Sequence, residues 1–168
     1  MVNIDYIMDL LDWNNNSEDQ LLGIKLARDV KCINAFLQPG FPYGKRVWDN
    51  CAKILSERTD EELSPYFVEL LEWLQDLNWP GTFIIINRLI LFNGDSLLET
   101  YSKVVYTALR NEEENNEWLD HLSKLLENHH LSKGLNRNLH NIMLEISEYD
   151  ILLDNTCLHT PVNRYQWR

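Results

Sequence analysis

Apolar side chains recur every three or four residues along most of this chain, which is the spacing that one face of an α-helix produces. The clearest stripe consists of Phe67, Leu70, Leu71, Leu74 and Leu77. Comparable stripes occupy residues 4–11, 22–30, 47–55, 97–108, 118–126 and 135–146. With only 6 Gly and 5 Pro in 168 residues, the chain lacks the turn chemistry of a many-stranded β protein. The pattern therefore predicts an all-α fold.

Polar residues with helix-capping chemistry stand where several of these stripes begin. In a capping box, each of two residues three positions apart bonds through its side chain to the backbone N–H of the other. Three pairs have this spacing: Ser17 with Gln20, Thr59 with Glu62, and Ser96 with Glu99. The first pair predicts the start of a helix whose inner face is Leu22, Leu26 and Val30.

Proline and glycine mark further boundaries. Ser64-Pro65 places a capping residue before a proline in the first helical position, and Pro80-Gly81 predicts a helix end. Residues 82–92 contain three consecutive Ile, which favours a strand, but their apolar positions also fit a helix buried between neighbours. The helical context on both sides decides for a helix. Residues 129–134 predict a turn, and residues 111–116 an acidic loop or a helix start.

These segments amount to about nine helices of roughly 10–15 residues each. Helix starts recur roughly every 15 residues, so two helices form a unit of about 30 residues, the rhythm of stacked antiparallel helix pairs. No repeated signature accompanies this rhythm, and a compact multi-helix bundle is the alternative. The Pro- and Gly-rich segment 38–44 suggests an N-terminal helical unit, 1–38, packed on a main helical domain, 43–153, with a C-terminal tail, 154–168.

Acidic side chains dominate the charge of the chain. The formal net charge is −11, and residues 57–120 hold 14 acidic and 4 basic side chains, nearly the whole excess. Nucleic-acid phosphates and anionic lipid headgroups would be repelled, which argues against nucleic acid and membranes as partners. The excess predicts either an ordinary solvated surface or a face for a basic protein.

No motif predicts catalysis, a metal or a cofactor. The three cysteines lack the Cys-x-x-Cys spacing of zinc and redox sites, and neither a Gly-x-Ser-x-Gly motif nor a Gly-rich phosphate loop is present. Glu114, Glu117 and His121 share a helix face, but no second ligand-rich helix accompanies them, so a hydrated surface is favoured over a metal site. The N-terminus has no signal-peptide pattern. We therefore expect a non-enzymatic cytoplasmic protein.

Residues 73–80 form the most unusual local segment, because Trp73, Asp76, Asn78 and Trp79 cluster at a predicted helix end. The simpler interpretation is structural: the indoles pack on neighbouring helices, and the polar side chains bond to the loop backbone. The alternative is a ligand or peptide pocket floored by the aromatic rings, with Asp76 as the polar anchor.

The run from residue 70 to 81, Leu-Leu-Glu-Trp-Leu-Gln-Asp-Leu-Asn-Trp-Pro-Gly, resembles the signature of DUF5071, a bacterial domain of unknown function. The resemblance extends upstream to Ser56 and residues 60–65 and downstream to residues 117–119. The resemblance implies a HEAT-type helical repeat, here a short α-solenoid of stacked antiparallel helix pairs. It implies no activity, cofactor or catalytic residue.

We therefore predict a protein-binding helical-repeat module with a basic partner. One version is an immunity or inhibitor protein that covers the phosphate-binding surface of a cationic toxin such as a nuclease. The alternative is a small-ligand-binding protein or enzyme with a pocket at residues 73–80. The candidate binding surface consists of Trp73, Asp76, Asn78, Trp79, Glu69, Glu72, Glu114 and Glu117.

Overall fold

The computed structural model describes the backbone of residues 3–157 and the side chains of residues 3–147, and every regular element within these residues is a helix. This confirms the all-α prediction. The α-helices are α1 Ile4–Leu10, α2 Ser17–Ala27, α3 Trp48–Ser56, α4 Asp60–Leu63, α5 Phe67–Glu72, α6 Thr82–Ile90, α7 Asp95–Ala108, α8 Glu112–Ser123, α9 His129–Gly134 and α10 Arg137–Cys157. Short 3-10 helices join them: η1 Ile33–Phe36, η2 Gly44–Val47, η3 Ser64–Tyr66, η4 Trp73–Gln75, η5 Leu109–Asn111 and η6 Lys124–Glu127.

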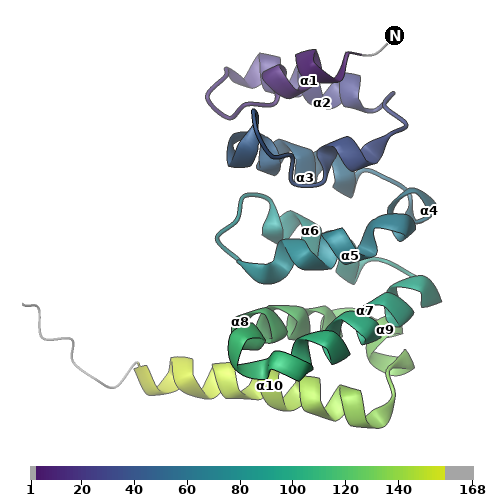
Figure 1. Cartoon of the computed structure of the whole chain (residues 1–168), viewed down its shortest axis with the longest axis vertical. Helices are drawn as coiled ribbons and strands as arrows, with labels where there is room; N and C mark the ends of the chain where they lie inside the picture. Colours follow the sequence, from purple (N-terminus) through teal and green to yellow (C-terminus); the bar gives the residue numbers. More distant parts are fainter. Residues whose placement is uncertain (1–2, 158–168) are drawn as a thin grey trace, which may run out of the picture.

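The helices lie in layers that follow one another in chain order along the long axis of the molecule (Figure 1). Helix α1 packs on α2, α2 on α3, α3 on α6, α5 on α7, and α8 on α10. The connections from α1 to α2, from η4 to α6 and from α7 to α8 lie at the left edge in this view. Between α2 and α3 the chain forms only the 3-10 helices η1 and η2. None of the helices within residues 3–157 has the length and apolar character needed to cross a bilayer.

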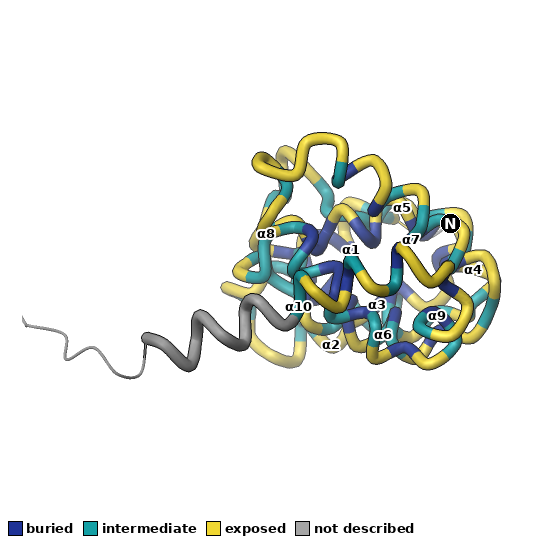
Figure 2. The backbone as a smooth tube through the Cα atoms, turned by 90° about the horizontal axis from the view of Figure 1, so that it is seen from below, coloured by how far each residue is buried: buried dark blue, intermediate teal, exposed yellow. Residues whose placement is uncertain are grey.

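One apolar core runs through all the layers, from Ile7 in α1 to Met143 in α10. Buried residues lie between the helices, and exposed ones line their outer faces (Figure 2). The predicted stripe of α5 and η4 is buried at Phe67, Leu70 and Leu71, with exposed fractions of 1% or less. The segment with three consecutive Ile is helix α6, as predicted.

The predicted inner face of α2 is wrong at Leu22, whereas Leu26 packs against the core and Val30, just after the helix, is buried as predicted. Leu22 is 40% exposed, whereas Gly23 and Ala27 are buried. The cause is the close approach of α1: a Cβ on Gly23 would lie 2.9 Å from Cδ2 of Leu11. Only a small residue fits at this contact, so Gly23 faces α1 and Leu22 faces solvent. The cap is also shifted by one residue, because Asn16 rather than Ser17 accepts the bond from the backbone N–H of Asp19.

Other capping predictions had mixed outcomes. The box of Thr59 and Glu62 is confirmed, with both reciprocal bonds present. The box predicted for Ser96 is wrong, because α7 already begins at Asp95 after Gly94, without a side-chain cap. Ser64 is not an N-cap either: its hydroxyl donates to the carbonyl of Glu61.

The predicted turn at residues 129–134 is helical, and the helix-start alternative for residues 111–116 is the correct one. Residues 129–134 form α9 rather than a turn, because the buried Asn128 accepts a bond from the N–H of Leu131 and starts a helix there. The acidic run after Asn111 starts α8. Helix α10 extends to Cys157, so residues 154–157 are not part of a tail, and residues 158–168 lie outside the described residues.

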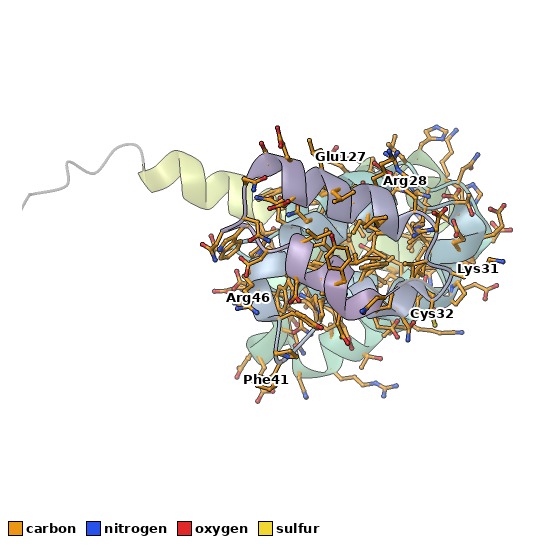
Figure 3. All side chains as sticks on the ribbon, turned by 90° about the horizontal axis from the view of Figure 1, so that it is seen from above. Arg28, Lys31, Cys32, Phe41, Arg46 and Glu127 are labelled. Carbon is orange, nitrogen blue, oxygen red and sulfur yellow. The ribbon has the colours of Figure 1, made fainter. Side chains whose placement is uncertain are left out.

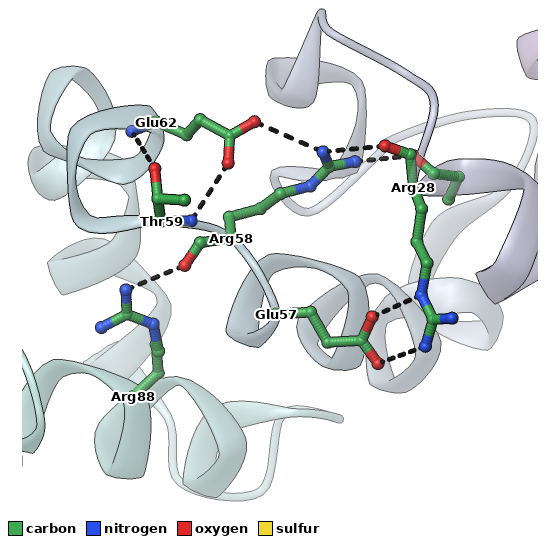
Figure 4. Close-up of polar contacts among 7 residues, drawn as sticks. Arg28, Glu57, Arg58, Thr59, Glu62 and Arg88 are labelled. Carbon is green, nitrogen blue, oxygen red and sulfur yellow. Dashed lines mark hydrogen bonds and ion pairs between the residues drawn. The ribbon is translucent and has the colours of Figure 1, made fainter.

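Arginine side chains connect successive layers (Figure 4). The guanidinium of Arg58 donates to the carbonyls of Ala27 at 2.6 Å and Arg28 at 3.3 Å. Arg88 donates to the carbonyl of Arg58 at 2.9 Å and pairs with Asp60 at 2.5 Å. Carbonyls at the C-terminal ends of helices have no partner within the helix. Here such carbonyls of one layer accept hydrogen bonds from guanidinium groups of the next layer.

Candidate binding surface

The segment that joins η4 to α6 is a closed, packed turn. Trp73 has no exposed surface, and its indole N–H donates to the carbonyl of Pro80 at 3.1 Å. The hydroxyl of Thr82 lies 2.9 Å from the carbonyl oxygen of Trp79 and 3.1 Å from that of Asp76. These bonds fold the turn back on itself.

Gly81 and Asp76 explain how the chain reverses within so few residues. Gly81 has a φ of +84°, and a Cβ at this position would lie 2.4 Å from Cβ of Ala52 in α3. The side chain of Asp76 accepts a bond of 2.8 Å from the backbone N–H of Asn78, the short-range bond by which Asp stabilises turns. Asp76 is therefore engaged within the turn, and the buried Trp73 cannot floor an open pocket. Trp79 is only half-buried and stands at the surface of this turn.

Helix α8 carries the exposed carboxylates of the candidate surface on a firmly held scaffold. The indole N–H of Trp118 donates to the carbonyl of Leu71 at 3.0 Å. Nδ1 of His121 lies 2.8 Å from the carbonyl oxygen of Leu74 and, facing an acceptor, must donate. Both bonds fix α8 on the end of α5 and η4. His121 therefore points into this helix contact, away from Glu114 and Glu117.

An open surface depression of about 620 Å³ lies beside the first turns of α8. Its lining residues are Gln75, Glu113, Glu114, Asn115, Asn116, Glu117 and Trp118. The structure thus brings Glu114 and Glu117 together with η4, next to the 73–80 turn. Glu69 and Glu72 are exposed on α5 but do not line this depression.

Sequence reasoning missed Gln75, Glu113, Asn115 and Asn116 as members of this surface. For Glu113, Asn115 and Asn116 the available signal is the unbroken polar run of residues 111–117 at a possible helix start. Gln75 has no such signal. Within residues 3–147, no group of three His, Cys, Asp or Glu side chains has the geometry to hold a metal ion.

The carboxylates around the depression have no cation of their own. Seven ion pairs form among the side chains of residues 3–147, and none includes Glu113, Glu114 or Glu117. Some other carboxylates do have a cationic partner: the hydrogen bond from Arg28, for example, lowers the pKa of Glu57. The first turn of α8 is therefore a region of uncompensated negative charge.

Burial of the Cys51 thiol argues against a nucleophile in α3. Cys51 is fully buried in α3, and desolvation raises the pKa of its thiol far above the ordinary value. A reactive cysteine needs the opposite, a lowered pKa and access to solvent. Cys51 is a small core residue of α3.

The chain was compared with protein families, curated proteins and solved structures. The model of the family described as domain of unknown function, DUF5071, matches residues 45–155. No curated protein and no solved structure matches the chain. The family match covers α3 to α10, including the 73–80 turn and the acidic start of α8, and accounts for more than half of the 168 residues. The chain therefore belongs to the DUF5071 family.

Proposed function

We propose that this protein is a non-enzymatic protein-binding module whose partner is a basic protein. The observation that carries the proposal is the depression at the start of α8, where Glu113, Glu114 and Glu117 are exposed and form no ion pair within residues 3–147. A cationic partner gains attraction there without displacing an internal cation. Complementary charge also raises the rate of encounter and discriminates against acidic competitors.

The scaffold suits such a surface. We infer that the layers form a short HEAT-like α-solenoid, since helices stack in chain order and arginines bond from one layer to the previous one at an interval of 30 residues. In such stacks the core holds the surface in a fixed geometry, and broad faces stay open for partners. Trp118 and His121 anchor α8 on the preceding layer, so the backbone that carries the carboxylates needs little ordering on binding.

One specific form of this function is inhibition of a cationic enzyme that acts on nucleic acid. The exposed carboxylates of Glu113, Glu114 and Glu117 lie within the first two turns of α8 and would occupy cationic side chains that otherwise hold phosphates. We propose that such an inhibitor acts in the cytoplasm and needs no cofactor. An enzyme or ligand pocket at residues 73–80 is less supported, because Trp73 is buried and Asp76 is bonded within the turn.

The proposal is tested by affinity capture from the source organism at low and at moderate salt, with mass spectrometry of the retained proteins. The bait variant replaces Glu113, Glu114 and Glu117 by Gln. Its control replaces Glu18 and Glu145 by Gln and Asp29 by Asn, three exposed carboxylates that form no ion pair among the described side chains. Both baits lose the same charge. We expect a basic protein that wild type and control retain, that added salt releases, and that the α8 variant loses. Equal retention by both variants would exclude the α8 surface.

A further inference from the structure

Two tryptophans form a corner at the edge of the stack where η4 turns into α6. The rings of Trp48 and Trp79 meet edge to face, with centroids 5.6 Å apart and an angle of 74° between their planes. Neither ring is fully buried, although both rest on the core. The ammonium group of Lys45 lies 5.4 Å from the centroid of Trp79 and 5.7 Å from that of Trp48. Aromatic faces attract cations at such distances.

Lys45 is held at this corner only by the rings. It is exposed and takes part in no ion pair among the described side chains. The indole N–H of Trp48, by contrast, is fixed by the carbonyl of Pro39 at 3.0 Å. The two rings therefore already stand in the arrangement that binds a cation. Lys45 can leave them, because its exposed ammonium group can be hydrated instead.

The loop that carries Lys45 also presents an apolar group to solvent. Phe41 is 102% exposed, although the loop is well ordered by bonds from the N–H groups of Tyr43 and Gly44 to the carbonyl of Gly40, both 2.9 Å. Phe41 and Arg46 project on the same side of the molecule (Figure 3). A large apolar side chain that gains nothing from its own fold is typical of interfaces, where aromatic residues are enriched.

The corner and the α8 depression lie on one continuous edge. Trp79 belongs to the turn that begins directly after Gln75, and Gln75 lines the depression with Glu113 and Glu117. A partner segment that reaches the carboxylates is thus close to the tryptophans. We propose that the Trp48–Trp79 corner binds an arginine or lysine side chain of the partner, which replaces Lys45 over the rings. This inference rests on the proposed basic partner and adds a specific recognition site to it.

The test uses an octa-arginine peptide as the probe and two single variants of the full chain. Lys45→Ala frees the corner, and Lys133→Ala removes an equal charge from α9, at the opposite edge (Figure 1). Both variants lose one positive charge and therefore have the same net charge. Because an exposed cation–π contact is worth a few-fold in affinity, we expect Lys45→Ala to bind the peptide about two- to five-fold more tightly than Lys133→Ala.

Equal affinity of the two variants, or no binding by Lys45→Ala at low salt, would overturn the inference. The α8 variant with Gln at positions 113, 114 and 117 is measured in parallel against its own charge-matched control. If it binds less peptide than that control while the lysine variants are equal, the corner is refuted and the acidic surface is retained. If neither comparison differs, both proposals fail.

Discussion

Arg88 donates a hydrogen bond of 2.9 Å to the backbone carbonyl of Arg58, and Arg58 donates one of 3.3 Å to the carbonyl of Arg28, in each case 30 residues earlier. The same residue type thus fills the same role in two successive layers. The accepting carbonyls lie in the connections after α2 and α3, where the helix offers no further N–H group to bond to them. These bonds couple the N-terminal layer, α1 and α2, to the part of the chain that matches the family model.

Replacing Arg58 by Met should destabilise the protein by about 1–3 kcal/mol, because the carbonyls of Ala27 and Arg28 lose a charged donor while the apolar stem is kept. The side chain of Arg58 is only 9% exposed. Replacing Arg28 by Met removes the exposed pair with Glu57 and should cost only about 0–1 kcal/mol. Urea unfolding of both variants checks the difference. Equal losses of unfolding free energy in the two variants would show that the bonds between layers contribute no more to stability than the exposed ion pair does.

Substitution of Asn128 should destabilise the protein at least as much as substitution of Arg58. The substitution by Asp is the informative one. Its amide donates to the carbonyls of Leu89 and Phe92, both at 2.8 Å, while its side-chain oxygen caps α9. Asp caps a helix as well as Asn does but cannot donate when ionised. We expect Asn128→Asp and Asn128→Ala each to cost about 2–4 kcal/mol in thermal or urea unfolding. An Asp variant as stable as wild type would mean that the cap alone matters.

Gly81 should tolerate alanine less well than Gly44 does. Both have positive φ, 84° and 64° respectively. Around Gly44 a Cβ meets no atom within 4 Å, whereas at Gly81 it meets Cβ of Ala52 at 2.4 Å. Gly44→Ala should therefore cost about 1–2 kcal/mol from backbone strain alone, and Gly81→Ala about 1–3 kcal/mol more from overpacking. Similar unfolding midpoints for the two variants would refute a tight contact between α3 and this turn.

The sequence predicted those elements whose apolar stripe is wide. The run from Phe67 to Leu74 and helix α6 were placed correctly, because large side chains there fill the space between layers. Helix α2 was predicted, but Leu22 was wrongly assigned to its inner face, because the buried positions there are the small residues Gly23 and Ala27, which contribute little to a hydrophobic pattern. Which face turns inward there depends on how closely α1 approaches, and that is a tertiary property.

The hydrogen bonds between layers could not be predicted from the sequence pattern, for a related reason. Arg28, Arg58 and Arg88 stand at equal intervals in the sequence, but a charged residue every 30 positions is not distinctive without the layers that bring donor and carbonyl together. For the site, the acidic run was visible, whereas its proximity to η4 depends on how Trp118 and His121 dock on α5 and η4. The burial of Trp73 likewise depends on a tertiary contact, its edge-to-face packing against Trp48 of α3.

Tyr43 should make stability depend on pH in the alkaline range. Its hydroxyl donates to the carboxylate of Asp5 at 2.7 Å, which raises the pKa of the phenol to about 12 from 10.0. A pKa raised by folding means that the stabilisation is complete below pH 10 and is lost as the pH rises toward 12. The difference in unfolding free energy between wild type and Tyr43→Phe should thus be constant from neutral pH to about pH 9 and shrink above pH 10. A difference that persists unchanged toward pH 12 would contradict the bond to Asp5.

The most direct measurement of the central claim is calorimetric titration of the captured basic partner at several salt concentrations. We predict that affinity falls steadily with salt and that the Gln variant at positions 113, 114 and 117 binds roughly tenfold more weakly, with a shallower salt dependence. The control at positions 18, 29 and 145 should match wild type. Binding that is insensitive to salt and equal in all three proteins would contradict a role for the acidic surface of α8.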